Sequence, residues 1–241
     1  MVRMSVDKTQ IKVVSFDCAQ TLLDVHWVPA EFAVECAKQI GLNLDEQVAG
    51  ETYNRMLQTQ YQGYILLNQE RNAAAADQFW RELGRDWLCR MGHEDRLEEL
   101  LIKADELMFG PNSIVFKLYP DTIPCLDEVK RRGYRMIVLS NWDISLHKVL
   151  RSFGLSDYFE AVFASMEHGC EKPDPRFFQV AIDHCQVSPG EFLHIGDNPL
   201  DDLMGAKKAG MNALVIDRSL DESMNWNLAR LTDLPAWLDQ K

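Results

Sequence analysis

The sequence predicts an α/β protein, a doubly wound (Rossmann-like) parallel sheet core with an inserted all-helical cap domain. Five short apolar runs have the length of buried parallel strands, and helical patterns alternate with the last four of them. The interval after the first run breaks this alternation, because it is helical for almost ninety residues. The chain has 241 residues, 46% of them hydrophobic, which is enough to bury such a core.

The predicted strands are residues 11–16, 136–139, 161–164, 192–195 and 213–216. The predicted helices, one before each of the last four strands, are residues 121–132, 145–153, 175–185 and 199–209. Gly133, Gly154 and Gly210 directly follow three of these helices, at the position where a left-handed residue commonly ends a helix. Sequential strands joined by helices predict parallel pairing.

The helical interval predicts a separate body. Trp80, Leu83 and Trp87 fall on one helical stripe, which indicates core packing rather than a ligand box. Loop signals border the interval at residues 24–29 and 110–120, where two linkers would fit. We therefore expect a core domain at 1–25 and 118–241 and a helical cap domain at 26–117, with a hinge that would let the cap move.

Composition excludes several classes of protein. The formal net charge is −12 and no run of basic residues is present, so nucleic acid is not an expected partner. Neither a membrane-spanning stretch nor a signal peptide is visible, so we expect a cytoplasmic protein without a membrane partner. The six cysteines form no CxxC pair, which suits reduced thiols. Oligomeric state is not readable from the sequence.

Polar residues follow four of the predicted strands, at the point where each strand ends. They are Asp17 after the first, Ser140 and Asn141 after the second, Lys172 in the loop after the third, and Asp197, Asp201 and Asp202 after the fourth. Ligands of doubly wound sheets bind beyond the carboxyl ends of the strands. We therefore expect these side chains to converge.

This set has a chemical logic. A carboxylate such as Asp17 can attack an electrophile and form a covalent ester or acyl phosphate. An acid cluster such as Asp197 and Asp202 can hold Mg²⁺, which prefers hard oxygen ligands. Lys172 would neutralise the charge that pushes nucleophile and phosphate apart. Either Asp201 or Asp202 could serve the metal, with Asp202 favoured by its register.

Three further residues are candidates for substrate binding. The hydroxyls of Thr21 and Ser140 can donate to phosphoryl or carboxylate oxygens. Asn141 either shapes the substrate pocket or fills the loop after the second strand. His194 lies inside the fourth predicted strand, where a packed, neutral histidine is the better interpretation.

Together these residues form four motifs. They are Asp17-x-x-x-Thr21-Leu22, Leu139-Ser140-Asn141, Lys172-Pro173-Asp174-Pro175, and Gly196-Asp197-x-x-x-x-Asp202. In this order the chain resembles the haloacid dehalogenase superfamily, in the subfamily (IA) whose helical cap is inserted just after the first motif. The resemblance covers about residues 12–217, and the cap matches only by position and helical character.

The resemblance implies a Mg²⁺-dependent hydrolase that acts on a small phosphorylated metabolite through an aspartyl-phosphate intermediate. It implies catalytic roles for Asp17 and Lys172. It also implies a metal site made by Asp17, Asp197 and Asp202 with the backbone carbonyl of Ala19.

At Ala19 the chain departs from the pattern of the family it resembles. Family phosphatases carry there a second aspartate, which protonates the leaving group, and alanine has no proton to give. General acid–base catalysis typically accelerates a reaction 10² to 10⁴-fold. We therefore expect the turnover of alkyl phosphates to be lower by roughly that factor. The alternatives are a hydrolase of carbon–halogen or carbon–phosphorus bonds, and a non-catalytic binding protein that has kept the pocket.

Overall fold

The computed structural model describes residues 8–224 and 226–239. The chain divides into two compact units, one formed by Met1–Asp24 with Leu118–Lys241 and the other by Val25–Lys117. We call the first unit the core and the second the insert. The insert begins one residue before the predicted start at 26, and it ends at 117.

The core contains a sheet of parallel strands in the order β5–β4–β1–β6–β7–β8. The strands are β1 (Val13–Phe16), β4 (Arg135–Ser140), β5 (Ala161–Ala164), β6 (Phe192–Gly196), β7 (Asn212–Ile216) and β8 (Asn227–Leu228). The five predicted strands are present. On β1, Phe16 lies opposite Val138 of β4 and Ile195 of β6, so these three strands end at one edge of the sheet.

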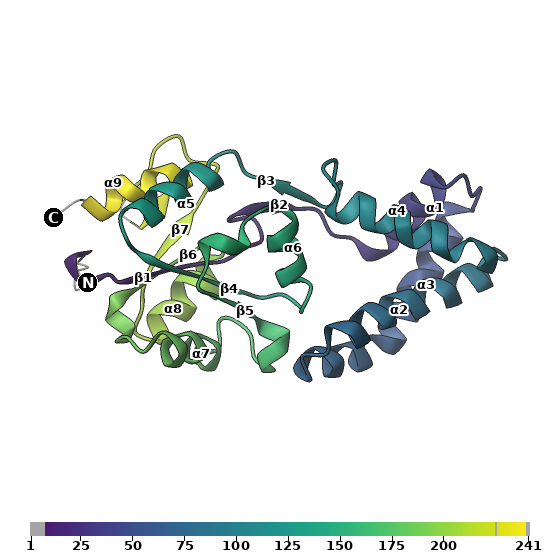
Figure 1. Cartoon of the computed structure of the whole chain (residues 1–241), viewed down its shortest axis with the longest axis horizontal. Coiled ribbons are helices and arrows are strands. Elements are labelled where there is room, and N and C mark those ends of the chain that lie inside the picture. The colour runs from purple at the N-terminus through teal and green to yellow at the C-terminus, as the bar shows by residue number, and fades with distance from the viewer. Residues whose placement is uncertain (1–7, 225, 240–241) are drawn as a thin grey trace. The chain divides into compact units, whose positions relative to one another are not determined.

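Helices cover both faces of this sheet. Figure 1 shows α5 (Thr122–Arg131) and α9 (Leu234–Asp239) on one face, and α7 (Pro175–Cys185) and α8 (Gly205–Lys208) on the other. The predicted doubly wound α/β fold is confirmed. A further helix, α6 (Leu146–Ser152), follows β4.

The face covered by α7 carries much of the core. Phe177 and Phe178 of α7 are fully buried against Val13 and Ile137 of the sheet. Burying one such ring stabilises the fold by about 2 kcal/mol. The helix begins there because the Asp174 side chain accepts a hydrogen bond from the Arg176 N–H at 2.9 Å, and proline follows the cap.

The predicted helix 199–209 is not regular. It consists of a π-helical turn, Pro199–Met204, followed by the short α8. Asn198 caps the turn by accepting hydrogen bonds from the N–H groups of Leu200 and Asp201. Such turns are often found at functional sites, and this one brings Asp202 into the interior, where it is 1% exposed.

The insert is a bundle of four α-helices in the part of the chain that is described. They are α1 (Pro29–Gln39), α2 (Glu46–Gln69), α3 (Ala73–Arg90) and α4 (Leu97–Phe109). Leu83 and Trp87 of the predicted stripe are fully buried, and the Trp87 Nε1–H donates to the Ala49 carbonyl at 2.9 Å. The stripe therefore packs the insert's own interior, while Trp80 is half-buried.

Three short strands were not predicted. One is β8 of the core sheet, and the other two, β2 (Leu23–Val25) and β3 (Phe116–Leu118), pair with each other. The interval up to residue 117 was expected to be helical throughout, and β3 shows that this is wrong for its last two residues. A strand of three residues is too short to show an alternating pattern. None of the described helices has the length and apolar character needed to cross a membrane.

Candidate active site

Asp17 is the first residue after β1 and is 6% exposed. Its backbone N–H donates to the Ile195 carbonyl at 2.8 Å, which continues the ladder between β1 and β6. Its Oδ1 accepts two hydrogen bonds, from Ser140 Oγ and from Lys172 Nζ, each at 2.7 Å. Oδ2 receives no hydrogen bond from the described residues, so it is the oxygen left to attack an electrophile or to bind a metal.

Lys172 lies between two carboxylates. Its ammonium donates to Asp17 Oδ1 at 2.7 Å and to Asp202 Oδ1 at 2.6 Å, and the residue is 3% exposed. Burial disfavours the charged amine, but the two carboxylates outweigh that effect and raise the pKa of Lys172. A permanent positive charge is therefore fixed beside the candidate nucleophile.

The backbone of Lys172 is held by Asn141. The Asn141 Nδ2 donates to the Lys172 carbonyl at 2.9 Å, and the Lys172 N–H donates to Asn141 Oδ1 at 2.8 Å. Both polar atoms of the amide are thus engaged with the loop that carries the lysine. The predicted substrate contact of Asn141 stays a prediction, and its contacts here are those of a residue that positions Lys172.

Asp17, Asp197 and Asp202 form a group whose carboxylate oxygens lie within 4.8 Å of one another. Burial, and then the charges of Asp17 and Asp202, raise the pKa of Asp197 to about 6. Burial is also the main reason that the pKa of Asp17 is raised. Three carboxylates face one ammonium, an excess of negative charge that favours a bound cation.

This donor set fits Mg²⁺. All three side chains offer hard oxygen ligands, and the site carries too little positive charge of its own. Asp17, Asp197 and Asp202 would hold the ion, with the Ala19 carbonyl as a further predicted ligand. Gly196 is required for this packing, because a Cβ there would lie 2.0 Å from Asp202 Cγ.

The positions of Asp201 and Asp202 show which of the two can serve as a metal ligand. Asp202 belongs to the carboxylate group and is 1% exposed. Asp201 is half-buried and outside that group, and its Oδ2 accepts a hydrogen bond from Asn198 Nδ2 at 3.1 Å. Burial opposes ionisation of Asp202, but Lys172 and His194 lower its pKa below the usual range.

The loop after Asp17 is a tight turn. The N–H groups of Leu22 and Leu23 both donate to the Cys18 carbonyl, at 2.9 and 3.0 Å. Gln20 has a φ of 54°, in the left-handed region that favours glycine, and its Oε1 accepts a hydrogen bond from Tyr119 Oη at 2.9 Å. The side chain is therefore tied down beside Ala19.

Thr21 is fully buried in this turn. Its Oγ1 has no hydrogen-bond partner among the residues that the structure describes. A buried hydroxyl without a partner costs free energy, so a ligand oxygen or a water molecule would satisfy it. This is compatible with the predicted role in substrate binding, which stays a prediction.

Two residues near the site were not singled out as functional from the sequence. His194 hydrogen-bonds to Asp202 at 2.9 Å and to Ser15 at 2.9 Å, and all three are buried. The packed position expected for His194 is observed, but the histidine also touches a site carboxylate. The sequence could have indicated the contact with Ser15, because side chains alternate along a strand and His194 lies opposite Ser15 on the same face of the sheet.

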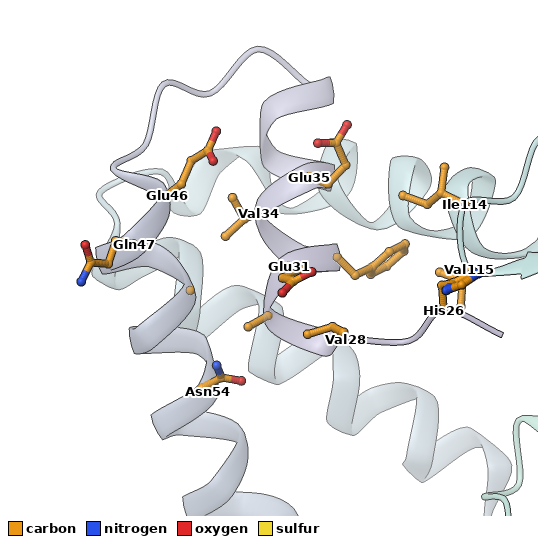
Figure 2. A pocket seen from close by; sticks show the side chains of 13 residues that line it. His26, Val28, Glu31, Val34, Glu35, Glu46, Gln47, Asn54, Ile114 and Val115 are labelled. Atoms are coloured by element: carbon orange, nitrogen blue, oxygen red, sulfur yellow. The ribbon is translucent and has the colours of Figure 1, made fainter.

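The insert has a pocket of its own, of about 770 Å³. Figure 2 shows Glu31 and Glu35 of α1 around it, with Glu46 of α2, beside apolar side chains such as Val34. Every lining residue belongs to the insert, and none is a predicted site residue. Its acidic lining does not suit a phosphorylated ligand.

Comparison with known proteins places the chain in a family. A family model described as haloacid dehalogenase-like hydrolase matches residues 11–210. The chain is 26% identical over 210 residues to the haloacid dehalogenase-like hydrolase domain-containing protein 3 of Bos taurus, covering 87% of this chain and 83% of that protein. It is 32% identical over 164 residues to a phosphatase of Mycobacterium tuberculosis, covering 67% of this chain and 70% of that protein.

The fold comparison agrees. A crystal structure of a 2-haloacid dehalogenase from Pseudomonas syringae has a TM-score of 0.62 and 25% sequence identity, over 95% of this chain and 98% of that chain. The family model alone spans more than four-fifths of the sequence. The chain therefore belongs to the haloacid dehalogenase-like hydrolases.

Proposed function

We propose that this hydrolase is a Mg²⁺-dependent phosphohydrolase of a small phosphorylated metabolite, with Asp17 as its nucleophile. The observation that carries the proposal is the arrangement around Asp17. Ser140 and Lys172 both bind Oδ1, and the carboxylates of Asp197 and Asp202 lie beside it. The similarity to a phosphatase supports the substrate class.

In the first step Asp17 Oδ2 attacks phosphorus, and the bond to the leaving-group oxygen breaks, which gives an aspartyl phosphate. Lys172 balances the negative charge of the phosphoryl oxygens. The Thr21 hydroxyl has no partner among the described residues, so it is the predicted donor to a phosphoryl oxygen. The Ser140 hydroxyl gives its one hydrogen to Asp17 Oδ1 and orients the nucleophile. Bound Mg²⁺ would supply charge neutralisation for the phosphoryl group. Water then cleaves the acyl phosphate and frees Asp17.

The side chain of Ala19 limits the first step. The departing oxygen needs a proton unless it is already a stable anion, and alanine cannot supply one. Aryl and acyl phosphates, whose leaving groups need little protonation, should therefore be hydrolysed better than alkyl phosphates.

Chemistry at a carbon–halogen bond would also need no acid, and one similar structure is a 2-haloacid dehalogenase. Displacement of halide by Asp17 needs no cation, so it would leave the acid cluster beside the nucleophile without a role. We therefore rank this reaction second.

The test is hydrolysis of p-nitrophenyl phosphate by the wild type and by Asp17→Asn, with Mg²⁺ and with EDTA. We expect turnover that requires both the metal and Asp17, because the variant keeps the volume of the side chain but loses its nucleophilic oxygen. Asp201→Asn, which alters a neighbouring acid outside the carboxylate group, is the control and should stay active. Turnover by purified Asp17→Asn, or turnover that survives EDTA, would refute the proposal.

A further inference from the structure

A buried histidine touches the carboxylate site without a place in the chemistry described above. His194 of β6 lies directly opposite Ser15 of β1. Both side chains are 0% exposed, on the face of the sheet that α7 covers. His194 Nδ1 lies 2.9 Å from Ser15 Oγ, and His194 Nε2 lies 2.9 Å from Asp202 Oδ1.

The chemistry of the partners fixes the direction of both hydrogen bonds. Asp202 Oδ1 accepts from the Lys172 ammonium and Oδ2 accepts from the Asn198 N–H, groups that can only donate, so both oxygens are acceptors. Nε2 must therefore carry the proton that is donated to Asp202. With its proton on Nε2 the ring offers Nδ1 as an acceptor, and the Ser15 hydroxyl is the donor that satisfies it.

These bonds decide which oxygen of Asp202 can bind anything else. Oδ1 accepts from both His194 Nε2 and Lys172 Nζ, at 2.9 and 2.6 Å, which uses its two lone pairs. Oδ2 accepts from the Asn198 N–H at 2.9 Å and keeps one lone pair. A cation held by Asp202 must therefore bind Oδ2.

We propose that His194, with its tautomer fixed by Ser15, is a positioning residue. It holds the carboxylate of Asp202 so that Oδ1 anchors the Lys172 ammonium and Oδ2 is presented to the metal. The inference rests on the proposed function for its effect on turnover. Its effect on metal binding does not depend on turnover.

The Ser15–His194–Asp202 chain is not a nucleophilic triad. Ser15 lies within β1, and its side chain is completely buried between β1 and the helices of that face. No substrate atom could reach its hydroxyl. Among the described residues, the chain acts on the site through Asp202, which contacts Lys172 and belongs to the carboxylate group.

The test measures Mg²⁺ binding by isothermal titration calorimetry, alongside p-nitrophenyl phosphate kinetics. His194→Leu keeps much of the side-chain volume but removes the donor, and we expect Mg²⁺ to bind about 10 to 100-fold more weakly. At saturating Mg²⁺ we expect kcat to fall while KM is unchanged, because the histidine does not touch substrate. His194→Gln, whose amide N–H reaches about as far as Nε2, should recover most of both losses.

Two further variants separate positioning from packing. Ser15→Ala removes only the donor to Nδ1 and should shift Mg²⁺ affinity in the same direction by less; it carries the test if His194→Leu does not fold. Phe178→Leu perturbs the ring that packs against His194, with centroids 5.5 Å apart, and leaves the polar chain intact. We expect it to lower the melting temperature and to leave Mg²⁺ affinity unchanged.

The inference is overturned if folded His194→Leu binds Mg²⁺ as the wild type does, or if His194→Gln is no better than His194→Leu. It is also overturned if Phe178→Leu weakens binding as much as His194→Leu. A wild type that binds Mg²⁺ but hydrolyses nothing refutes the proposed function alone, since the order of affinities among the variants still reports on His194.

Discussion

Acidification should weaken Mg²⁺ binding, and Asp197 sets the scale of the effect. Its pKa is raised to about 6 by burial and by the charges of Asp17 and Asp202. A proton on a ligand carboxylate competes with the metal, so affinity falls as the pH drops through that pKa. Asp202, whose pKa is lowered, stays ionised in this range and adds nothing to the effect.

The magnitude follows from the competition. The apparent dissociation constant is multiplied by one plus the ratio of proton concentration to the acid constant of Asp197. With the pKa of about 6, this factor is ~1.1 at pH 7 and ~11 at pH 5, so affinity should fall about tenfold. The raised pKa of Asp17 acts in the same direction, which makes tenfold a lower bound.

Isothermal titration calorimetry at pH 7, 6 and 5 measures this directly. Asp197→Asn should bind Mg²⁺ weakly at every pH and show a much flatter profile, because the titrating ligand is gone. Asp201→Asn, the acid outside the carboxylate group, should keep the wild-type profile. A wild-type change of less than about twofold between pH 7 and 5, or an unchanged profile in Asp197→Asn, would refute the reasoning.

Three other outcomes are expected. Ala19→Asp should raise kcat/KM on an alkyl phosphate by about 10²-fold or more, with little change on p-nitrophenyl phosphate, and equal effects on both would contradict the missing-acid argument. Gly196→Ala should cost about 2 kcal/mol of unfolding free energy in urea titrations, since its Cβ would meet a carboxylate, while Gly190→Ala, which has open space, serves as the control. Asn141→Ala should lower kcat about tenfold, because it removes the two hydrogen bonds that hold the Lys172 backbone. An unchanged kcat would show that these hydrogen bonds are dispensable.

Much of the fold could be predicted from the sequence, for a physical reason. Strand and helix periodicity is local, and a parallel sheet of buried strands leaves continuous apolar runs such as that of β1. The strands that were missed are short: β2 and β3 have three residues each and β8 has two, too few for any pattern to stand out. The sequence predicts a regular helix where the π-helical turn holds Asp202, because the composition of this segment suits both.

The sequence by itself determined which polar residues end the strands, because strand ends are local features and parallel strands present their carboxyl ends at one edge. It also showed the absence of a carboxylate at Ala19, which no fold can replace at that position.

Only the tertiary structure decided how those residues are partnered. Ser140 and Lys172 meet one oxygen of Asp17 from 123 and 155 residues away. Asn141 binds a backbone rather than presenting a free amide, and His194 binds a site carboxylate. Such pairings depend on the register of neighbouring strands and on distances of a few tenths of an ångström, which residue order alone does not contain.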